Sequence, residues 1–241
     1  MSQMNNANRS RFSAIYQSLR DSGWLFLIIG LIVGLLFPAF VRILGVDVEG
    51  FLENLVPEFI GIVFTVLIID TLDKRRENSL IREQLIRQLH SYYNPVALQS
   101  IEELRVLGYL SDGSLKNLDL RGSDWRDANL YEAVLIGSDL RNAKLQKADL
   151  AHANLKDVQV TEEQLVTTDI MWRCVMPDGS LYDGRYNLPH DFEVAVRKGH
   201  NLNDPASMAD YYGVTVEQYL AGQRWAAEHL DDLKRRAGVS G

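Results

Sequence analysis

The sequence of 241 residues is poor in cysteine and contains only Cys174. A single cysteine excludes an intrachain disulfide framework and a zinc site built from cysteine ligands, and a free thiol fits a reducing compartment. Because Cys174 lies in an apolar stretch without the sequence signature of a nucleophile, we expect it to be a small residue of the core.

The usual signatures of catalysis and of cofactor binding are also missing. The chain has no glycine-rich phosphate-binding loop and no G-x-S-x-G segment. The histidines have no carboxylate partner at metal-site spacing. They are His90, His152, His190, His200 and His229. We therefore expect a protein that is not an enzyme, with no catalytic residue, no cofactor and no metal.

The chain lacks an excess of basic residues. Its 25 Lys and Arg stand against 32 Asp and Glu, a formal net charge of −7, whereas nucleic-acid binding requires a basic surface. Residues 209–215 resemble the turn of a DNA-binding helix-turn-helix. The helix that follows, however, begins Thr-Val-Glu-Gln-Tyr and has Arg224 as its only base before Lys234. We interpret this segment as a structural helix pair and expect no nucleic-acid partner.

Two apolar runs near the N-terminus predict a membrane anchor. Residues 24–41 carry no charge and as a helix would extend about 27 Å, close to the ~30 Å hydrocarbon core of a bilayer. A signal peptide is the alternative, but the run is long for one and no A-x-A site follows it. A second run over residues 55–72 is interrupted by Glu58 and Asp70. Together the runs predict a two-helix transmembrane hairpin over residues 24–72.

Glu58 and Asp70 have two interpretations. Acids inside a membrane are commonly functional, as pore or proton-relay groups. The interpretation that we favour places them at the two interfaces of the membrane, with Asp70 reaching Lys74 one helical turn further on.

The distribution of basic residues predicts the orientation of the hairpin. Basic residues flank the two spans, whereas the connecting loop is acidic. They are Arg9, Arg11 and Arg20 before the first span, and Lys74, Arg75 and Arg76 after the second. Because basic flanks stay in the cytoplasm, we expect both termini there, including the polar N-terminal segment 1–23.

Residues 116–165 repeat every five positions. The fifth position is Leu in eight of the ten blocks, and the third is Ser or Ala in seven consecutive blocks. A period of five puts the leucines on no single face of a helix and on alternating faces of a strand. The pattern instead predicts a chain that turns a corner every five residues and keeps the fifth position inside.

The repeat resembles the pentapeptide-repeat family, whose motif is A-(D/N)-L. Matching triplets begin at Ala128, Ala148 and Ala153. The resemblance implies a short right-handed β-helix of square section over residues 111–165, with little more than two coils. The two-span start and the tail are similar to those of membrane-anchored bacterial members, which implies a multi-pass protein of the bacterial inner membrane.

The segments on either side of the repeat predict caps, so the expected fold class is α+β and multi-domain. Residues 73–110 show helical periodicity, and their second helix could cover the open end of the β-helix. In residues 166–241 we expect a β-hairpin, with strands near 170–176 and 180–182. Three helices should follow it, over about 191–198, 205–212 and 215–236.

These features predict a membrane-tethered interaction module that presents the β-helix to a protein partner. One alternative is a subunit of an oligomeric membrane channel or transport component. Another comes from the family, in which some members mimic DNA and inhibit topoisomerase. Such mimicry needs a strongly acidic exterior, and nine acids against seven bases in residues 116–165 leave only −2. The sequence does not name the partner, and a homo-oligomer stays open.

Two apolar residues occupy consecutive outward positions of the repeat. Tyr131 and Ile136 stand where Arg121, Arg126 and Arg141 stand in neighbouring blocks. Exposed apolar residues flanked by arginine suggest a partner contact. The alternative is that the helices before or after the repeat cover both side chains.

Overall fold

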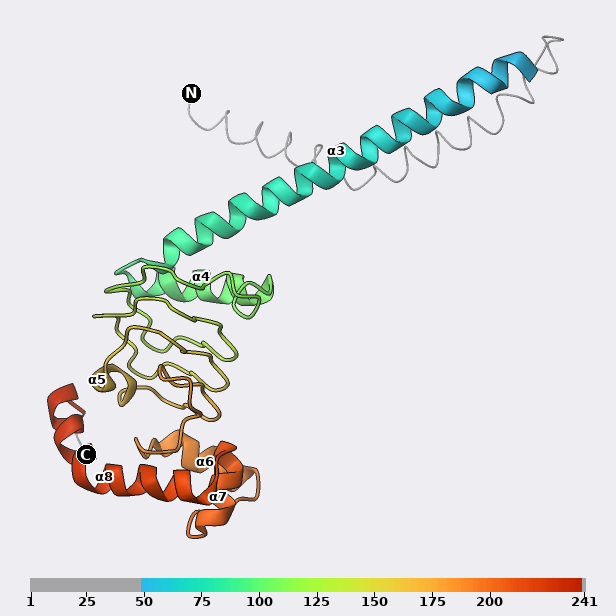
Figure 1. Cartoon of the computed structure of the whole chain (residues 1–241). Coiled ribbons are helices and arrows are strands. Elements are labelled where there is room, and N and C mark those ends of the chain that lie inside the picture. Colours follow the sequence, from blue (N-terminus) through green and yellow to red (C-terminus); the bar gives the residue numbers. More distant parts are fainter. Residues whose placement is uncertain (1–48, 240–241) are drawn as a thin grey trace, which may run out of the picture. The chain divides into compact units, whose positions relative to one another are not determined.

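The computed structural model describes residues 49–239, with side chains for residue 61 and residues 63–239 (Figure 1). The chain divides into two compact units, Met1–Glu77 and Asn78–Gly241. The expected N-terminal segment 1–23 and the expected first span lie outside the described residues.

Helix α3 (Glu49–Leu89) begins in the first unit and ends in the second. It confirms the helical prediction for residues 55–72. Several large apolar side chains between Phe64 and Leu72 are 43–65% exposed, and they follow one another around the helix. Asp70 pairs with Lys74 at 3.5 Å, one turn apart.

In the part of the chain that the structure describes, no helix combines the length and the apolarity that a membrane crossing needs. The described residues therefore give no support to the expected second span over residues 55–72.

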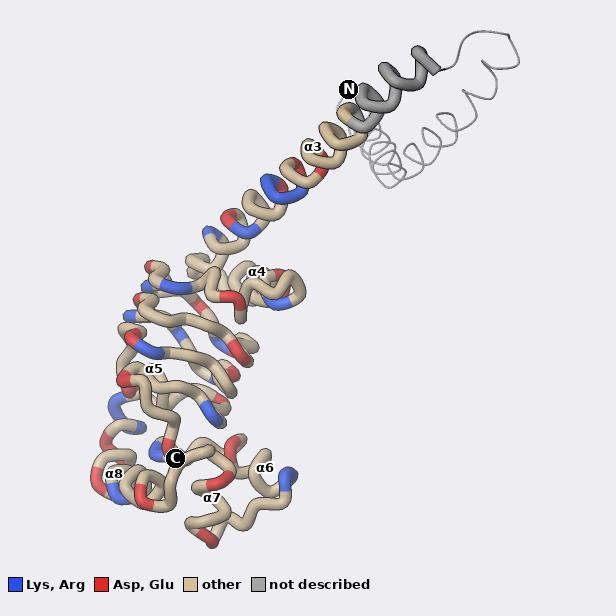
Figure 2. The backbone as a smooth tube through the Cα atoms, turned by 45° about the vertical axis from the view of Figure 1, so that its right-hand side comes forward, with Lys and Arg blue, Asp and Glu red and all other residues tan. Residues whose placement is uncertain are grey.

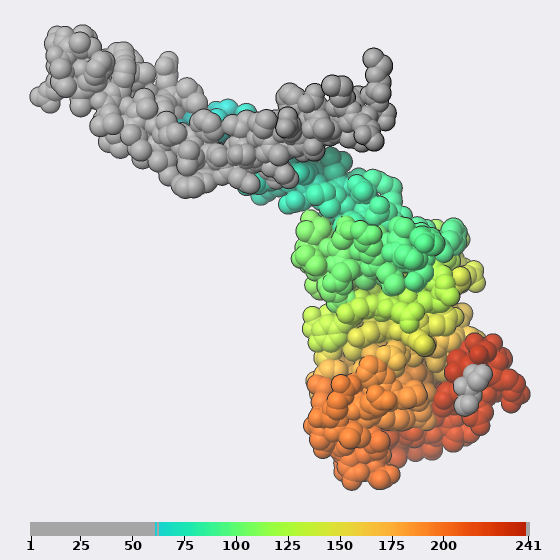
Figure 3. Space-filling view, turned by 180° about the vertical axis from the view of Figure 1, so that it is seen from behind, coloured from blue at the N-terminus to red at the C-terminus, as the bar shows by residue number. Residues whose placement is uncertain are grey.

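Stacked turns of chain form the centre of the second unit, and they succeed one another as layers in Figure 3. Isolated parallel bridges join residues twenty positions apart, such as Asp119 with Asp139 and Asn129 with Asp149. Because each side takes five residues, twenty residues make one coil of four sides. Each side is so short that it forms single bridges, and the described residues contain no continuous strand.

Each corner places the second residue of a repeat in the left-handed region, with φ between 56° and 71°. These residues are Asn117, Gly122, Asp127, Glu132, Gly137, Asn142, Lys147, His152 and Asp157. The N–H of the next residue donates to the carbonyl three positions earlier, as from Ala133 to Leu130 at 3.0 Å. This is a β-turn with positive φ at its third residue, as in type II. The turn redirects the chain from one side of the coil to the next.

The predicted interior of the coil is confirmed. Side chains at the fifth position, from Leu120 to Leu155, are at most 1% exposed. Those at the third position, from Ser123 to Ala153, are at most 4% exposed. Small third residues let successive sides approach closely, so the leucines fill the space between them.

Helix α4 (Asn94–Val106) covers the first coil, where the sequence predicted a cap. The Asn94 amide donates to the carbonyl oxygens of Asp124 and Arg126 at 3.1 and 2.8 Å. The apolar side of α4 joins the core of the coil through Ala97, Ile101 and Leu104. Because no coil lies before the first one, these contacts satisfy backbone groups that would otherwise lack partners.

The coil continues beyond residue 165, the predicted end of the β-helix. Helix α5 (Glu162–Leu165) replaces one side of the third coil, and the Gln164 amide donates to the carbonyl oxygens of Leu140 and Ala143, both at 2.7 Å. One residue is inserted there, so later bridges are twenty-one apart, as between Asn154 and Val175.

The expected hairpin is therefore part of the coil. Its first strand, near residues 170–176, forms the last two sides, and Val175 also bridges Leu181 in antiparallel fashion. The inserted residue hides this continuity from the sequence, because it shifts the five-residue period without interrupting the stacking.

Three helices follow the coil: α6 (Pro189–Arg197), α7 (Pro205–Tyr212) and α8 (Val216–Ala237). They agree with the predicted helices to within two residues at each end. Helix α8 packs against α7 and α5, which joins the tail to the third coil.

We predict that Leu140→Ala lowers the free energy of unfolding of residues 78–241 by about 2–5 kcal/mol, because the side chain is buried and leaves a cavity. Urea denaturation measures this change. Lys147→Ala is the control, since this exposed corner residue should tolerate alanine within about 0.5 kcal/mol. An unchanged midpoint for Leu140→Ala would show that the assigned phase of the repeat is wrong.

Candidate interaction surface

An aromatic column begins at Tyr131 and runs across the coils to α7. The Tyr131 ring lies 5.4 Å from the ring of His152, edge to face, and His152 lies 4.5 Å from Trp172 in the same manner. Trp172 in turn stacks on Tyr211 at 5.6 Å and 15°. The residues come from three successive coils and one helix, so the column connects the repeat to the tail.

The far end of the column is held firmly and carries positive charge. The Trp172 indole N–H donates to the carbonyl oxygen of Tyr211 at 2.6 Å. The Lys198 ammonium lies 3.9 Å from the centre of the Trp172 ring, and the Arg173 guanidinium lies 5.6 Å from it. Both distances are in the range of cation–π attraction. These contacts leave the Trp172 ring little freedom to meet a partner.

The near end of the column is open. Tyr131 is 37% exposed, and its N–H donates to the side-chain oxygen of Asn129 at 3.1 Å. Partial burial raises the pKa of the Tyr131 phenol, which stays neutral at physiological pH. Burial likewise lowers the pKa of His152, so the neighbouring imidazole favours its neutral form. The two rings at the open end are therefore uncharged, and the Glu132 carboxylate lies beside the Tyr131 hydroxyl.

Ile136 lies at the next corner, one five-residue side from Tyr131. It is half-buried, whereas Tyr131 is exposed. The structure thus places the two candidate residues at adjacent corners of one coil but exposes only one of them widely. Asp139 lies beyond Ile136 and is held by Arg141 at 2.6 Å and Arg121 at 3.7 Å.

Charges of both signs alternate over the outside of the coil (Figure 2). Many pair between consecutive repeats: Arg126 donates to both carboxylate oxygens of Asp124 at 2.7 Å, and Arg121 and Asp119 pair similarly. The bond from Arg126 lowers the pKa of Asp124 to about 2. This mixed surface agrees with the balanced charge that the sequence showed for the repeat.

Cys174 is a core residue, as predicted. It is fully buried, and burial raises the pKa of its thiol far above the ordinary value, which removes the reactive thiolate. Among the described residues, no group of three or more histidine, cysteine or acidic side chains is placed to hold a metal ion.

A buried acid, Asp191, lies where α6 meets the third coil, and no pattern in the sequence indicates its burial. Asp191 is fully buried and accepts a hydrogen bond from the Met171 N–H at 3.2 Å. Its second carboxylate oxygen and the hydroxyls of Tyr211 and Tyr212 are buried without a partner. Burial raises the pKa of Asp191 to about 7. In the sequence Asp191 is indistinguishable from an ordinary acid in the first turn of a helix.

Comparison with known families agrees with this geometry. The family described as Pentapeptide repeats matches residues 110–146 and, overlapping them, residues 126–161, with eight copies of the repeat. This segment consists of pentapeptide repeats. The pentapeptide-repeat coil continues structurally past the match, through α5 to Val175. Neither a curated protein nor a solved structure matches the chain.

We predict that Asp191 makes the stability of the protein depend on pH. The folded state binds this proton more tightly than the unfolded state, whose pKa is near 3.8. The contribution of Asp191 is therefore complete below about pH 4 and is lost as the pH rises through about 7. Urea denaturation of the protein and of Asp191→Asn across this range tests the point.

The difference in unfolding free energy between the two proteins should change between about pH 4 and pH 7 in favour of the asparagine variant. Taking the difference cancels the opposite contribution of acids such as Asp124, whose pKa is lowered. A difference that stays constant with pH would contradict a buried, proton-binding Asp191.

Proposed function

We propose that the protein is a non-enzymatic interaction module tethered to the bacterial plasma membrane. Residues 24–72 would form the anchor, both termini would lie in the cytoplasm, and the pentapeptide-repeat coil would present a rigid surface to a partner protein. The observation that carries the proposal is the coil itself. Since the third and fifth positions fill the interior, the outward positions are free to serve a partner.

Two features support the tether. Residues 24–41 are free of charge over a length close to that of a bilayer core. On α3, Phe64, Ile69 and Leu72 are 53–65% exposed, and so many apolar side chains in water would be costly. Lipid would remove that cost, and the basic residues after Leu72 would then stay in the cytoplasm.

The open end of the aromatic column supports the interaction surface. Tyrosine supplies a large, stiff contact area with a polar tip, and it is enriched at interfaces. Tyr131 stands on a stiff support, because its coil is bonded on both sides: the Leu130 N–H donates to Asp149 and the Val134 N–H donates to Leu110. A pre-formed surface of this kind loses little conformational entropy on binding.

The proposal predicts that anchor and surface can be separated. Exchanging residues 1–72 for an unrelated two-span hairpin of the same topology should preserve both membrane attachment and the partner set. The double variant Tyr131→Asp, Ile136→Asp should remain on the membrane and lose the partners, because a charge replaces an apolar side chain at each of two adjacent corners. Chemical crosslinking in cells followed by mass spectrometry measures the partner set.

Val196→Asp on α6 is the matched control, since Val196 is 56% exposed and lies far along the chain from the repeat edge. It should leave the partner set intact. Loss of the partners after the hairpin exchange alone would instead favour a channel or transport component. A chain that leaves the membrane fraction on alkaline washing would refute the tether.

A further inference from the structure

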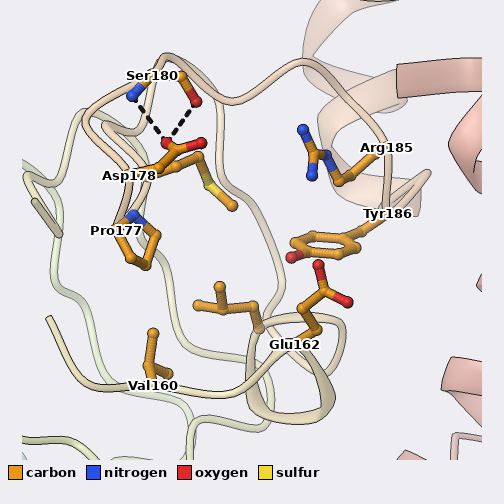
Figure 4. Close-up of a pocket in the computed structure, with 9 residues that line it drawn as sticks. Val160, Glu162, Pro177, Asp178, Ser180, Arg185 and Tyr186 are labelled. Carbon is orange, nitrogen blue, oxygen red and sulfur yellow. Dashed lines mark hydrogen bonds between the residues drawn. The ribbon is translucent and has the colours of Figure 1, made fainter. Parts of the chain in front are cut away.

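A pocket with a volume of about 230 Å³ lies where the third coil ends (Figure 4). Its apolar wall comes from Val160, Leu165 and Met176. The polar groups come from three segments that surround this wall: Glu162 at the start of α5, Asp178 in the turn after the coil, and the loop that carries Tyr186. An apolar wall with a few convergent polar groups is the usual form of a binding site.

The pocket carries excess negative charge. The Asp178 carboxylate accepts hydrogen bonds from the N–H and the hydroxyl of Ser180 at 2.9 and 2.6 Å. These bonds lower the pKa of Asp178, so the carboxylate is ionised at neutral pH. Arg185 also lines the pocket. Its guanidinium donates two hydrogen bonds of 2.9 Å to the carboxylate of Asp183, a residue outside the pocket lining. Glu162 and Asp178 thus share one basic neighbour whose hydrogen bonds go to Asp183, and the lining of the pocket keeps one net negative charge.

Tyr186 supplies a second and independent sign of an occupant. The residue is fully buried, and its hydroxyl oxygen has no hydrogen-bond partner. Figure 4 shows this hydroxyl directed toward the inside of the pocket, on the side where Glu162 lies. A phenol hydroxyl can donate and accept a hydrogen bond, so an occupant that reaches it would satisfy it.

Size and charge together define the class of ligand. A volume of about 230 Å³ is below the range of pockets for drug-sized molecules and suits a group of the size of one side chain. Two carboxylates against one guanidinium favour a cationic occupant, the Tyr186 hydroxyl offers it a further hydrogen bond, and the apolar wall favours an aliphatic stem. We propose that the pocket binds a guanidinium or ammonium group on an aliphatic stem, as in arginine or lysine.

Such a group could belong to a partner protein or to a free alkylguanidine, and the site does not depend on the function proposed above. The test uses the full chain with methyl-labelled methionine, since Met176 reports directly on the pocket. The probes are agmatine, the capped tripeptide Ala-Arg-Ala and its citrulline counterpart, in which the guanidinium is replaced by a neutral isostere.

We expect a saturable shift of the Met176 methyl signal with the arginine tripeptide and none with the citrulline tripeptide. Glu162→Gln should weaken binding by about fivefold, the effect of losing one partly exposed ion pair. Glu163→Gln is the matched control: Glu163 is the next residue of α5, pairs with Arg236 at 2.8 Å and does not line the pocket. The affinity of the Glu163→Gln variant for the arginine tripeptide should stay unchanged.

A shift with agmatine alone would assign the site to a free amine, and a shift with the tripeptide would assign it to a protein side chain. Equal binding of the citrulline tripeptide, or no Met176 shift at about 10 mM probe, tenfold above a Kd of about 1 mM, would overturn the proposal. Neither outcome affects the partner-set experiment on Tyr131, so the two proposals fail separately.

Discussion

The structure of the second unit depends on one backbone constraint, the left-handed residue at the second position of each repeat. Residues with a side chain enter the left-handed region at a cost in free energy, so each corner must be stabilised by its surroundings. The compensation comes from burial of the fifth-position leucines and from hydrogen bonds between coils, such as that from Leu135 to Asn154 at 3.0 Å. Corner and core therefore stabilise each other, and neither a single repeat nor a single coil would satisfy both.

The hydrogen bonds between coils also explain the need for caps. A coil exposes backbone donors and acceptors at each end, and an uncovered end would pair with another chain. At the start, α4 and Asn94 take this role. At the end, the antiparallel bridge of Val175 with Leu181 and the packing of the tail do so. The Figure 4 pocket lies at this second boundary, where regular stacking stops and side chains converge less closely.

The interior of the repeat was predictable from sequence because it obeys a fixed period: leucines such as Leu140 recur every five residues and all lie inside. The third coil was not predicted. The block 161–165 keeps leucine at its fifth position, but it forms helix α5, and the five-residue period is lost after it. The capping box of Thr161 with Gln164 was a visible signal for that helix. The aromatic column was not predictable, since the inserted residue displaces Trp172 from the register of Tyr131. Nor was the burial of Asp191, because packing between distant segments determines it.

Amide hydrogen exchange of residues 117–158 tests the central claim most directly. Amides at the fourth and fifth positions donate to neighbouring coils, as from Asp139 to Leu118 at 2.9 Å, and should exchange slowly. Amides at the first position, such as those of Tyr131 and Arg141, donate only to side chains two residues earlier and should exchange more quickly. The account predicts protection with a period of five residues through the repeat. A helical period of about 3.6 residues, or protection without any period, would contradict it.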